Sequence, residues 1–162
     1  MVLLVGLWLF GTGEALIVDA GLGVTPWTVL AQGLSTRLPL SIGVATFIVS
    51  TLVLALWIPL RERPGLGTVA NVVVIAVALQ VMIGVLPSPS AVAVRLAMVL
   101  GGIALIGLAS GLYLTANLGP GPRDGWMTGM HQRTGWPVSA IRLTIEGAVL
   151  VIGWLLGGSV GL

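Results

Sequence analysis

The sequence predicts an all-α polytopic membrane protein with five transmembrane helices, two short non-spanning helices, and an inverted-topology tandem repeat with the sixth helix missing. Three observations lead to this prediction. The chain is 57% hydrophobic and only 7% charged, with a mean hydropathy of +1.12. It contains five apolar runs long enough to span a bilayer, and it matches itself when shifted by 96 positions. A soluble domain needs a far more polar exterior than this composition supplies.

The apolar runs give the expected spanning helices in chain order. A helix needs about twenty mainly apolar residues to cross the hydrocarbon core of a bilayer. The runs lie at 2–20, 40–60, 68–86, 92–116 and 138–156. The first run is not a secretory signal, because it lacks a basic start and carries Glu14 and Asp19 where a cleavage site would follow.

Two longer connections, 21–39 and 117–137, interrupt the apolar pattern. Glycine permits an unusual turn, and proline favours the first turn of a helix. Both residue types stand at each helix break, as Gly23 and Pro26 and again as Gly119 and Pro122. We therefore expect each connection to turn into a short non-spanning helix, at 24–35 and 120–133.

The shift of 96 positions places the two breaks on each other. Rarer residue types coincide in one ungapped register: Pro26 with Pro122, Arg37 with Arg133, Gly33 with Gly129, and Gly65 with Gly161. Leucines and valines would match by chance in so apolar a chain, but these coincidences indicate a duplication. The single transmembrane domain, 1–162, then consists of two repeats, 1–90 and 91–162.

The repeat also predicts topology. The first copy has three crossings, an odd number, so the second copy enters the membrane from the opposite side, as in many secondary transporters. The second copy stops before a counterpart of the helix at 68–86. Either the chain is truncated or a neighbouring subunit fills that place. Four arginines on the loops 61–65 and 117–137 oppose Arg37 and Arg95, which predicts a cytoplasmic N-terminus.

Several function classes find no support in the residues. Cysteine is absent, which excludes disulfides, thiolate metal sites and thiol catalysis. The chain has no metalloprotease, serine-hydrolase or phosphate-loop motif, so we expect no enzyme activity, no cofactor and no metal site. It also has no basic stripe that could hold a nucleic acid.

Ionisable residues within apolar runs are functional candidates because a charge in lipid is costly. Glu14 has no partner on its own helix and is the first candidate for a protonation-linked role. Arg142 and Glu146 are four residues apart, so they share a helix face and could form an ion pair. That pair is either a structural bridge or a part of substrate or proton handling.

The second break, "LGPGPRDGW", concentrates charge as Arg123 and Asp124. A helix that begins near Pro122 directs free N–H groups toward the break, where an anion or the carboxylate of Asp124 could satisfy them. Arg123 could then bind a substrate anion or a lipid phosphate. The alternative is that both residues are interfacial and mark the cytoplasmic edge of the fourth spanning helix.

Other residues have simpler expected uses. Tryptophans near predicted helix ends are expected to anchor the protein at the membrane interface: Trp27, Trp126, Trp136 and Trp154. Small residues let helices approach closely in lipid, and Gly102, Gly107 and Gly111 give the fourth spanning helix such a face.

Four stretches carry a family resemblance: "GLGVTPWTVLAQGLS", "WIPLRERPGLGTVANVVVI", "GLYLTANLGPGPRDGWMTGM" and "VLVIGWLLGGSVGL". Together they resemble the YczE/YyaS/YitT-like family of bacterial integral membrane proteins, and most of all its YczE branch. The resemblance implies a multi-pass protein of the bacterial cytoplasmic (inner) membrane and specifies no activity. Members of that family usually begin with a few basic residues and end with a sixth hydrophobic segment, neither of which this sequence has.

Two functions remain open. The first is a small-solute transporter or permease with a site between the two repeats, which would take a small anionic or polar solute. The second is a non-transporting accessory protein that stabilises or localises a partner complex. In either case membrane lipid is the expected surrounding partner, and a homodimer or a membrane partner is compatible with both.

Overall fold

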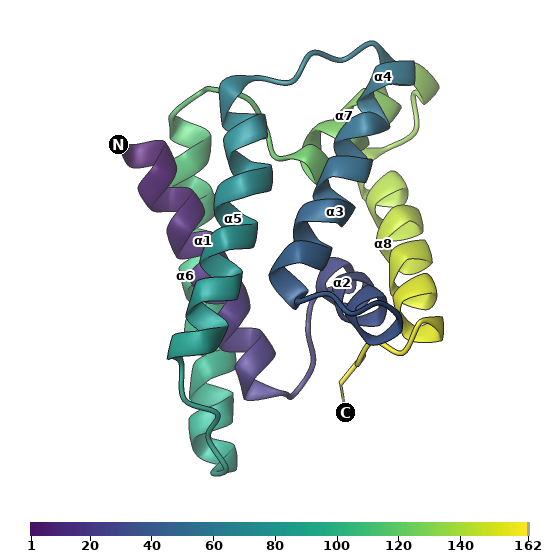
Figure 1. Ribbon diagram of the computed structural model, residues 1–162. Coiled ribbons are helices and arrows are strands. Elements are labelled where there is room, and N and C mark those ends of the chain that lie inside the picture. The colour runs from purple at the N-terminus through teal and green to yellow at the C-terminus, as the bar shows by residue number, and fades with distance from the viewer. Residues whose placement is uncertain (162) are drawn as a thin grey trace.

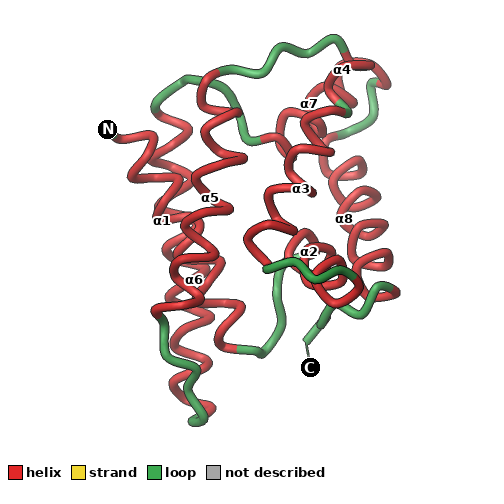
Figure 2. Tube along the Cα trace, in the orientation of Figure 1, coloured by secondary structure: helices red, strands yellow, loops and turns green. Residues whose placement is uncertain are grey.

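The computed structural model describes residues 1–161 as helices joined by loops, with no strand among those residues (Figure 2). The helices are α1 Val2–Ala20, α2 Pro26–Arg37, α3 Ile42–Ala55, α4 Trp57–Leu60, α5 Leu66–Val85, α6 Val92–Thr115, α7 Pro122–Thr134 and α8 Val138–Leu155. Five candidate spans are long and apolar enough to cross a membrane, and α3 with α4 makes one of them. The all-helical multi-pass prediction is therefore confirmed, with boundaries that differ by at most two residues from those expected.

The second span contains a break that the sequence prediction of one helix at 40–60 did not include. α3 ends at Ala55, and α4 begins at Trp57. Pro59 explains the position, because a proline ring clashes with the carbonyl group four residues earlier, which belongs to Ala55. The Leu56 N–H bonds to the carbonyls of both Leu52 and Val53, as expected where a helix tightens at its end.

The two short helices begin at the expected prolines. Pro26 and Pro122 each occupy the first turn of their helix, where the missing N–H group costs nothing. Gly23 and Gly119 have positive φ angles of 136° and 111°, which other residue types rarely adopt. Both helix breaks therefore use glycine and proline in the same way.

The helices form two groups (Figure 1). The three-helix group contains α1, α5 and α6, with α1 packed on both of the others. The five-helix group contains α2, α3, α4, α7 and α8, and α3 provides the main contact to α5 of the first group. Within the five-helix group, α2 lies near one end of the long helices and α7 near the other (Figure 1).

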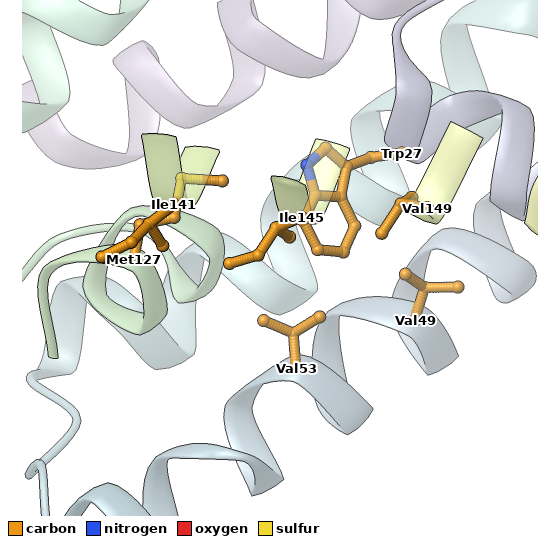
Figure 3. Close-up of a cluster of buried hydrophobic side chains, with 7 residues drawn as sticks. All are labelled: Trp27, Val49, Val53, Met127, Ile141, Ile145 and Val149. Atoms are coloured by element: carbon orange, nitrogen blue, oxygen red, sulfur yellow. The ribbon is translucent and has the colours of Figure 1, made fainter. Parts of the chain in front are cut away.

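Apolar side chains from four helices fill the five-helix group (Figure 3). The buried cluster consists of Trp27, Val49, Val53, Met127, Ile141, Ile145 and Val149. Both short helices contribute to it, Trp27 from α2 and Met127 from α7. Because lipid offers no hydrophobic driving force between helices, this cluster holds the group together by close packing.

Glycine brings α1 and α6 into close contact. A Cβ atom on Gly6 would lie 3.2 Å from the Ala109 carbonyl oxygen, and one on Gly13 would lie 2.9 Å from the Gly102 carbonyl oxygen. As the residue number rises along α1, that of its neighbour on α6 falls, so the two helices run antiparallel. Gly102 packs as expected, but Gly107 and Gly111 have nothing within 4 Å, so that part of the expected face is wrong. Spacing cannot tell which side of an all-apolar helix meets a neighbour.

Further close approaches recur at the spacing of 96 residues. A Cβ atom on Gly33 would lie 2.8 Å from Leu156 Cβ, and one on Gly129 would lie 3.1 Å from Leu60 Cδ1. The Gly65 backbone lies against Leu118, and the Gly161 backbone lies against Leu22. In each case, both members of one contact are shifted by 96 relative to the members of the other.

Candidate functional site

A cavity of about 520 Å³ lies between the two helix groups. Seven helices contribute to its lining, all except the short α4. Its lining includes every charged residue expected on a substrate or ion pathway: Glu14, Arg123, Asp124, Arg142 and Glu146. The structure therefore brings together residues that lie up to 132 positions apart in the chain.

Glu14 enters the cavity from α1 and is only 3% exposed. Its partner comes from the other helix group, since Arg123 Nη1 on α7 lies 3.6 Å from Glu14 Oε1. This distance is longer than a hydrogen bond, so the pair is held by charge. The second oxygen, Oε2, is buried and has no hydrogen-bond partner within residues 1–161.

Arg123 lies in the first turn of α7, with 21% of its side chain exposed. Its guanidinium carbon lies 5.0 Å from the centre of the Trp27 ring, a cation–π arrangement that orients the guanidinium group. Trp27 comes from α2, so one contact joins the starts of the two short helices. Arg123 therefore lies beside the buried Glu14 and lines the cavity.

Asp124 follows in the same turn of α7 and accepts a hydrogen bond from the Tyr113 hydroxyl group, with an O–O distance of 3.2 Å. A carboxylate in the first turn of a helix also interacts favourably with the helix dipole. Tyr113 belongs to α6, so this contact, like that of Arg123 with Glu14, crosses from one helix group to the other.

Arg142 and Glu146 form the ion pair that their spacing predicts. Arg142 Nε donates to Glu146 Oε1 at 2.9 Å, on one face of α8. The Arg142 side chain is 63% exposed and that of Glu146 is 28% exposed, so the pair lies at an open edge of the cavity. Each residue satisfies the other there, which lowers the cost of keeping both charged.

Both helix breaks reach the cavity through their capping residues. Thr25 and Pro26 at the start of α2, and Gly121 and Pro122 at the start of α7, all line it. The side chain of Thr25 makes no cap hydrogen bond, and Gly121 has no side chain that could make one. Two helix N-termini, each with a partial positive charge, thus face the same space.

The sequence prediction missed several lining residues, including Trp27, Ser50, Ser110 and Tyr113. The internal match does contain a signal for three of them. A shift of 96 places Trp27 on Arg123, Ser50 on Glu146, and Glu14 on Ser110. The repeat partners of three charged candidates, Glu14, Arg123 and Glu146, therefore line the same cavity. The repeat partners of Asp124 and Arg142, which are Thr28 and Thr46, do not line it, and Tyr113 carried no such signal.

The expected role of Trp27 as an interfacial anchor is wrong, because its side chain is 4% exposed and lies in the buried cluster. Trp136 and Trp154 are 61% and 62% exposed, as an anchor at a membrane surface would be. Hydropathy placed all of these residues near helix ends. It could not show that the first turn of α2 is covered by α7 and α8.

Among residues 1–161, no three side chains of histidine, aspartate or glutamate lie close enough together to hold a metal ion. His131 is exposed at the end of α7, with Nδ1 2.6 Å from the Trp136 carbonyl oxygen. The lining residues of the cavity offer charged groups, hydroxyl groups and backbone N–H groups to a ligand.

Comparisons with known proteins place this chain in a family. Residues 1–161 match the model of a family of unknown function, DUF6198. An uncharacterised protein of Haemophilus influenzae is 45% identical over 161 residues, which cover 99% of this chain and 74% of that protein.

A second relative is the uncharacterised membrane protein YczE of Bacillus subtilis, which is 30% identical over 158 residues. That alignment covers 96% of this chain and 74% of YczE. No solved structure gives a significant match. The chain therefore belongs to the DUF6198 family, and it is similar over most of its length to the membrane protein YczE, as its sequence motifs predict.

Proposed function

We propose that this protein is a small-solute carrier whose binding site is the cavity between the two helix groups, built by two inverted repeats. One observation carries the proposal: a single cavity collects all five charged residues of the expected pathway together with the starts of both short helices. Its volume of about 520 Å³ falls within the range typical of small-molecule sites, roughly 300–1,000 Å³.

Paired contacts support an inverted repeat. Gly6 meets Ala109 and Gly13 meets Gly102, so each contact becomes the other when α1 and α6 exchange places. This is the contact pattern of a two-fold axis. Because the two helices are antiparallel, such an axis lies perpendicular to them and thus within the membrane plane. The positions of α2 and α7 near opposite ends agree with that arrangement (Figure 1).

The lining of the cavity supports a site between the repeats. Several lining residues form pairs separated by 96 positions: Phe10 with Ile106, Glu14 with Ser110, Pro26 with Pro122, Trp27 with Arg123, and Ser50 with Glu146. A cavity on the repeat axis would have this composition. In inverted-repeat transporters the substrate site lies at the repeat interface near the bilayer midplane, often at broken helices.

The two helix groups meet at the cavity through few polar contacts, which favours relative motion. The ion pair between Glu14 and Arg123 and the hydrogen bond between Tyr113 and Asp124 both join α7 to the three-helix group. Contacts of this kind can break and re-form as a carrier opens on either side. A purely structural bundle would gain more from an apolar interior at the same place.

Transport can be tested directly. The purified protein is reconstituted into liposomes, and counterflow of labelled solute and the internal pH are followed for small organic anions, zwitterions and polyols. We expect a counterflow signal for at least one solute class. Glu14→Gln should alter it without loss of membrane insertion, because glutamine has nearly the same shape without the charge.

Glu62→Gln is the matched control, since Glu62 lies in the loop before α5 and does not line the cavity. An unchanged signal in Glu14→Gln together with loss in Arg123→Ala would move the site from α1 to the helix break. If neither wild type nor variants transport any solute, while the protein co-purifies with a defined membrane complex, the accessory function replaces the carrier.

A further inference from the structure

Arg123 has hydrogen-bonding capacity that its present neighbours do not use. A guanidinium group carries five N–H donors. Its nearest acidic oxygen, Glu14 Oε1, is 3.6 Å away, and its other close neighbour is the face of the Trp27 ring. The guanidinium group of Arg123 borders a cavity of about 520 Å³. Its free N–H groups can still donate hydrogen bonds to an anion there with good geometry.

Glu14 is the complementary half of this arrangement. Glu14 lines the cavity and is 3% exposed, and its Oε2 atom is buried with no hydrogen-bond partner within residues 1–161. A buried carboxylate that loses its cation would be left charged and unpaired, which is strongly unfavourable. The same carboxylate becomes neutral if it binds a proton.

The other acidic groups at the cavity already have partners. Asp124 accepts a hydrogen bond from Tyr113, and Glu146 accepts one from Arg142. The starts of α2 and α7 add positive potential to the same space. An anion that enters would therefore compete with Glu14 alone for Arg123.

We propose that the cavity binds a small anionic solute at Arg123, and that the solute displaces the Glu14 carboxylate, which takes up one proton. This inference rests on the proposed carrier function and specifies its substrate class and its coupling. One anion and one proton enter together. An O–H bond forms on Glu14, the Arg123 charge passes from Glu14 to the solute, and the net charge of the cavity with its ligand is unchanged.

The charged and titratable groups around Glu14 are few. α7 contributes Arg123 and Asp124, α6 contributes Tyr113, and α8 contributes the partly exposed pair Arg142 and Glu146. α5, which packs on α1, has no titratable residue, and Arg95 of α6 instead donates to the carbonyl oxygens of Ala20 and Gly21 at the end of α1. Among residues 1–161, Glu14 is thus the acidic residue that lies within ion-pair distance of Arg123.

The test measures binding to the full chain in nanodiscs of phosphatidylcholine, followed by tryptophan fluorescence because Trp27 lies beneath Arg123. The probes are methanesulfonate and benzenesulfonate, which stay anionic at every pH used. Methanesulfonamide and benzenesulfonamide are their neutral counterparts, and phenyltrimethylammonium is the cation. We expect only the sulfonates to bind, and their dissociation constants to rise about tenfold per pH unit where one proton is linked to binding.

Two variants separate the roles. Glu14→Gln imitates the protonated acid, so sulfonate binding should become tight and independent of pH. The double variant Glu14→Gln/Arg123→Gln leaves no unpaired buried charge, so it should fold and yet bind sulfonate at least about tenfold more weakly than Glu14→Gln, the loss expected for a charged hydrogen bond. Arg133→Gln, at the exposed end of α7, is the control that keeps wild-type binding.

Three results would overturn the inference. These are binding of phenyltrimethylammonium in preference to the sulfonates, sulfonate binding by wild type that does not depend on pH, or full binding by the double variant. Repeating the measurement with phosphatidylglycerol in the nanodiscs tests a lipid source of the anion. If phosphatidylglycerol abolishes the binding of sulfonate at Arg123, the site is assigned to a lipid headgroup. Binding without any flux would refute the carrier while leaving the anion site intact.

Discussion

At the residue scale, glycine decides which helix faces meet. A Cβ atom on Gly13 would lie 2.7 Å from Ile106 Cγ1, whereas nothing lies within 4 Å of one on Gly107. Both residues are glycines in the interior of long apolar helices, so hydropathy does not distinguish their positions. Their different surroundings make them a matched pair for testing the crossing of α1 and α6.

We expect Gly13→Ala to destabilise the protein by about 1–3 kcal/mol, the usual cost of overpacking a close contact. Gly107→Ala should leave stability unchanged or slightly raise it, because alanine favours the helix and meets no neighbour. Thermal unfolding in detergent, followed by circular dichroism, compares the two. Equal midpoints would show that α1 and α6 do not approach as closely as described.

At the element scale, the break between α3 and α4 positions the second short helix. It places Trp57 where its Nε1 donates to the Pro122 carbonyl oxygen at 2.9 Å, while the ring packs on Gly125. Trp57 is 3% exposed. The start of α7, and with it Arg123, is therefore held by a side chain from the second span.

Trp57→Phe keeps an aromatic ring but removes the hydrogen-bond donor. We therefore expect the free energy of unfolding to fall by about 1 kcal/mol, which is typical of one hydrogen bond. The loss should be local, seen as faster hydrogen exchange over 122–134 with little change in α1. Trp8→Phe is the control, since Trp8 is 40% exposed on α1. Equal exchange in both variants would mean that Trp57 does not hold α7.

At the scale of the whole molecule, the distribution of arginines predicts on which side of the membrane the N-terminus lies. Because the sequence contains no cysteine, a single cysteine introduced by mutation can report the side on which its loop lies. Ser88 lies in the exposed loop between α5 and α6, and Thr134 lies at the exposed end of α7. With a cytoplasmic N-terminus, five crossings put Ser88 outside and Thr134 inside.

We expect an impermeant maleimide to label Ser88→Cys in intact cells and to label Thr134→Cys only after the membrane is opened. The reverse pattern would invert the orientation. Labelling of both residues, or of neither, before lysis would contradict the five crossings themselves, because α6 alone separates the loop at Ser88 from the start of the second helix break.

Much of this architecture could be predicted from the sequence, because lipid imposes a simple rule. A backbone in hydrocarbon must satisfy its own hydrogen bonds, so each apolar run of about twenty residues becomes a helix. Glycine and proline likewise fixed the two breaks locally, through a positive φ angle at Gly23 and a missing donor at Pro26. The spacing of Arg142 and Glu146 fixed their ion pair, since four residues make about one helical turn.

The sequence by itself determined which segments are helices, where they break, and which charges lie within them. Only the tertiary structure decided that Glu14 faces Arg123, that Trp27 is buried beneath that arginine, and that Gly107 has no neighbour. The physical reason is that helix formation depends on nearby residues and the solvent. The pairing of Glu14 with Arg123, 109 positions away, depends instead on how apolar helices of similar hydropathy pack, which periodicity does not encode.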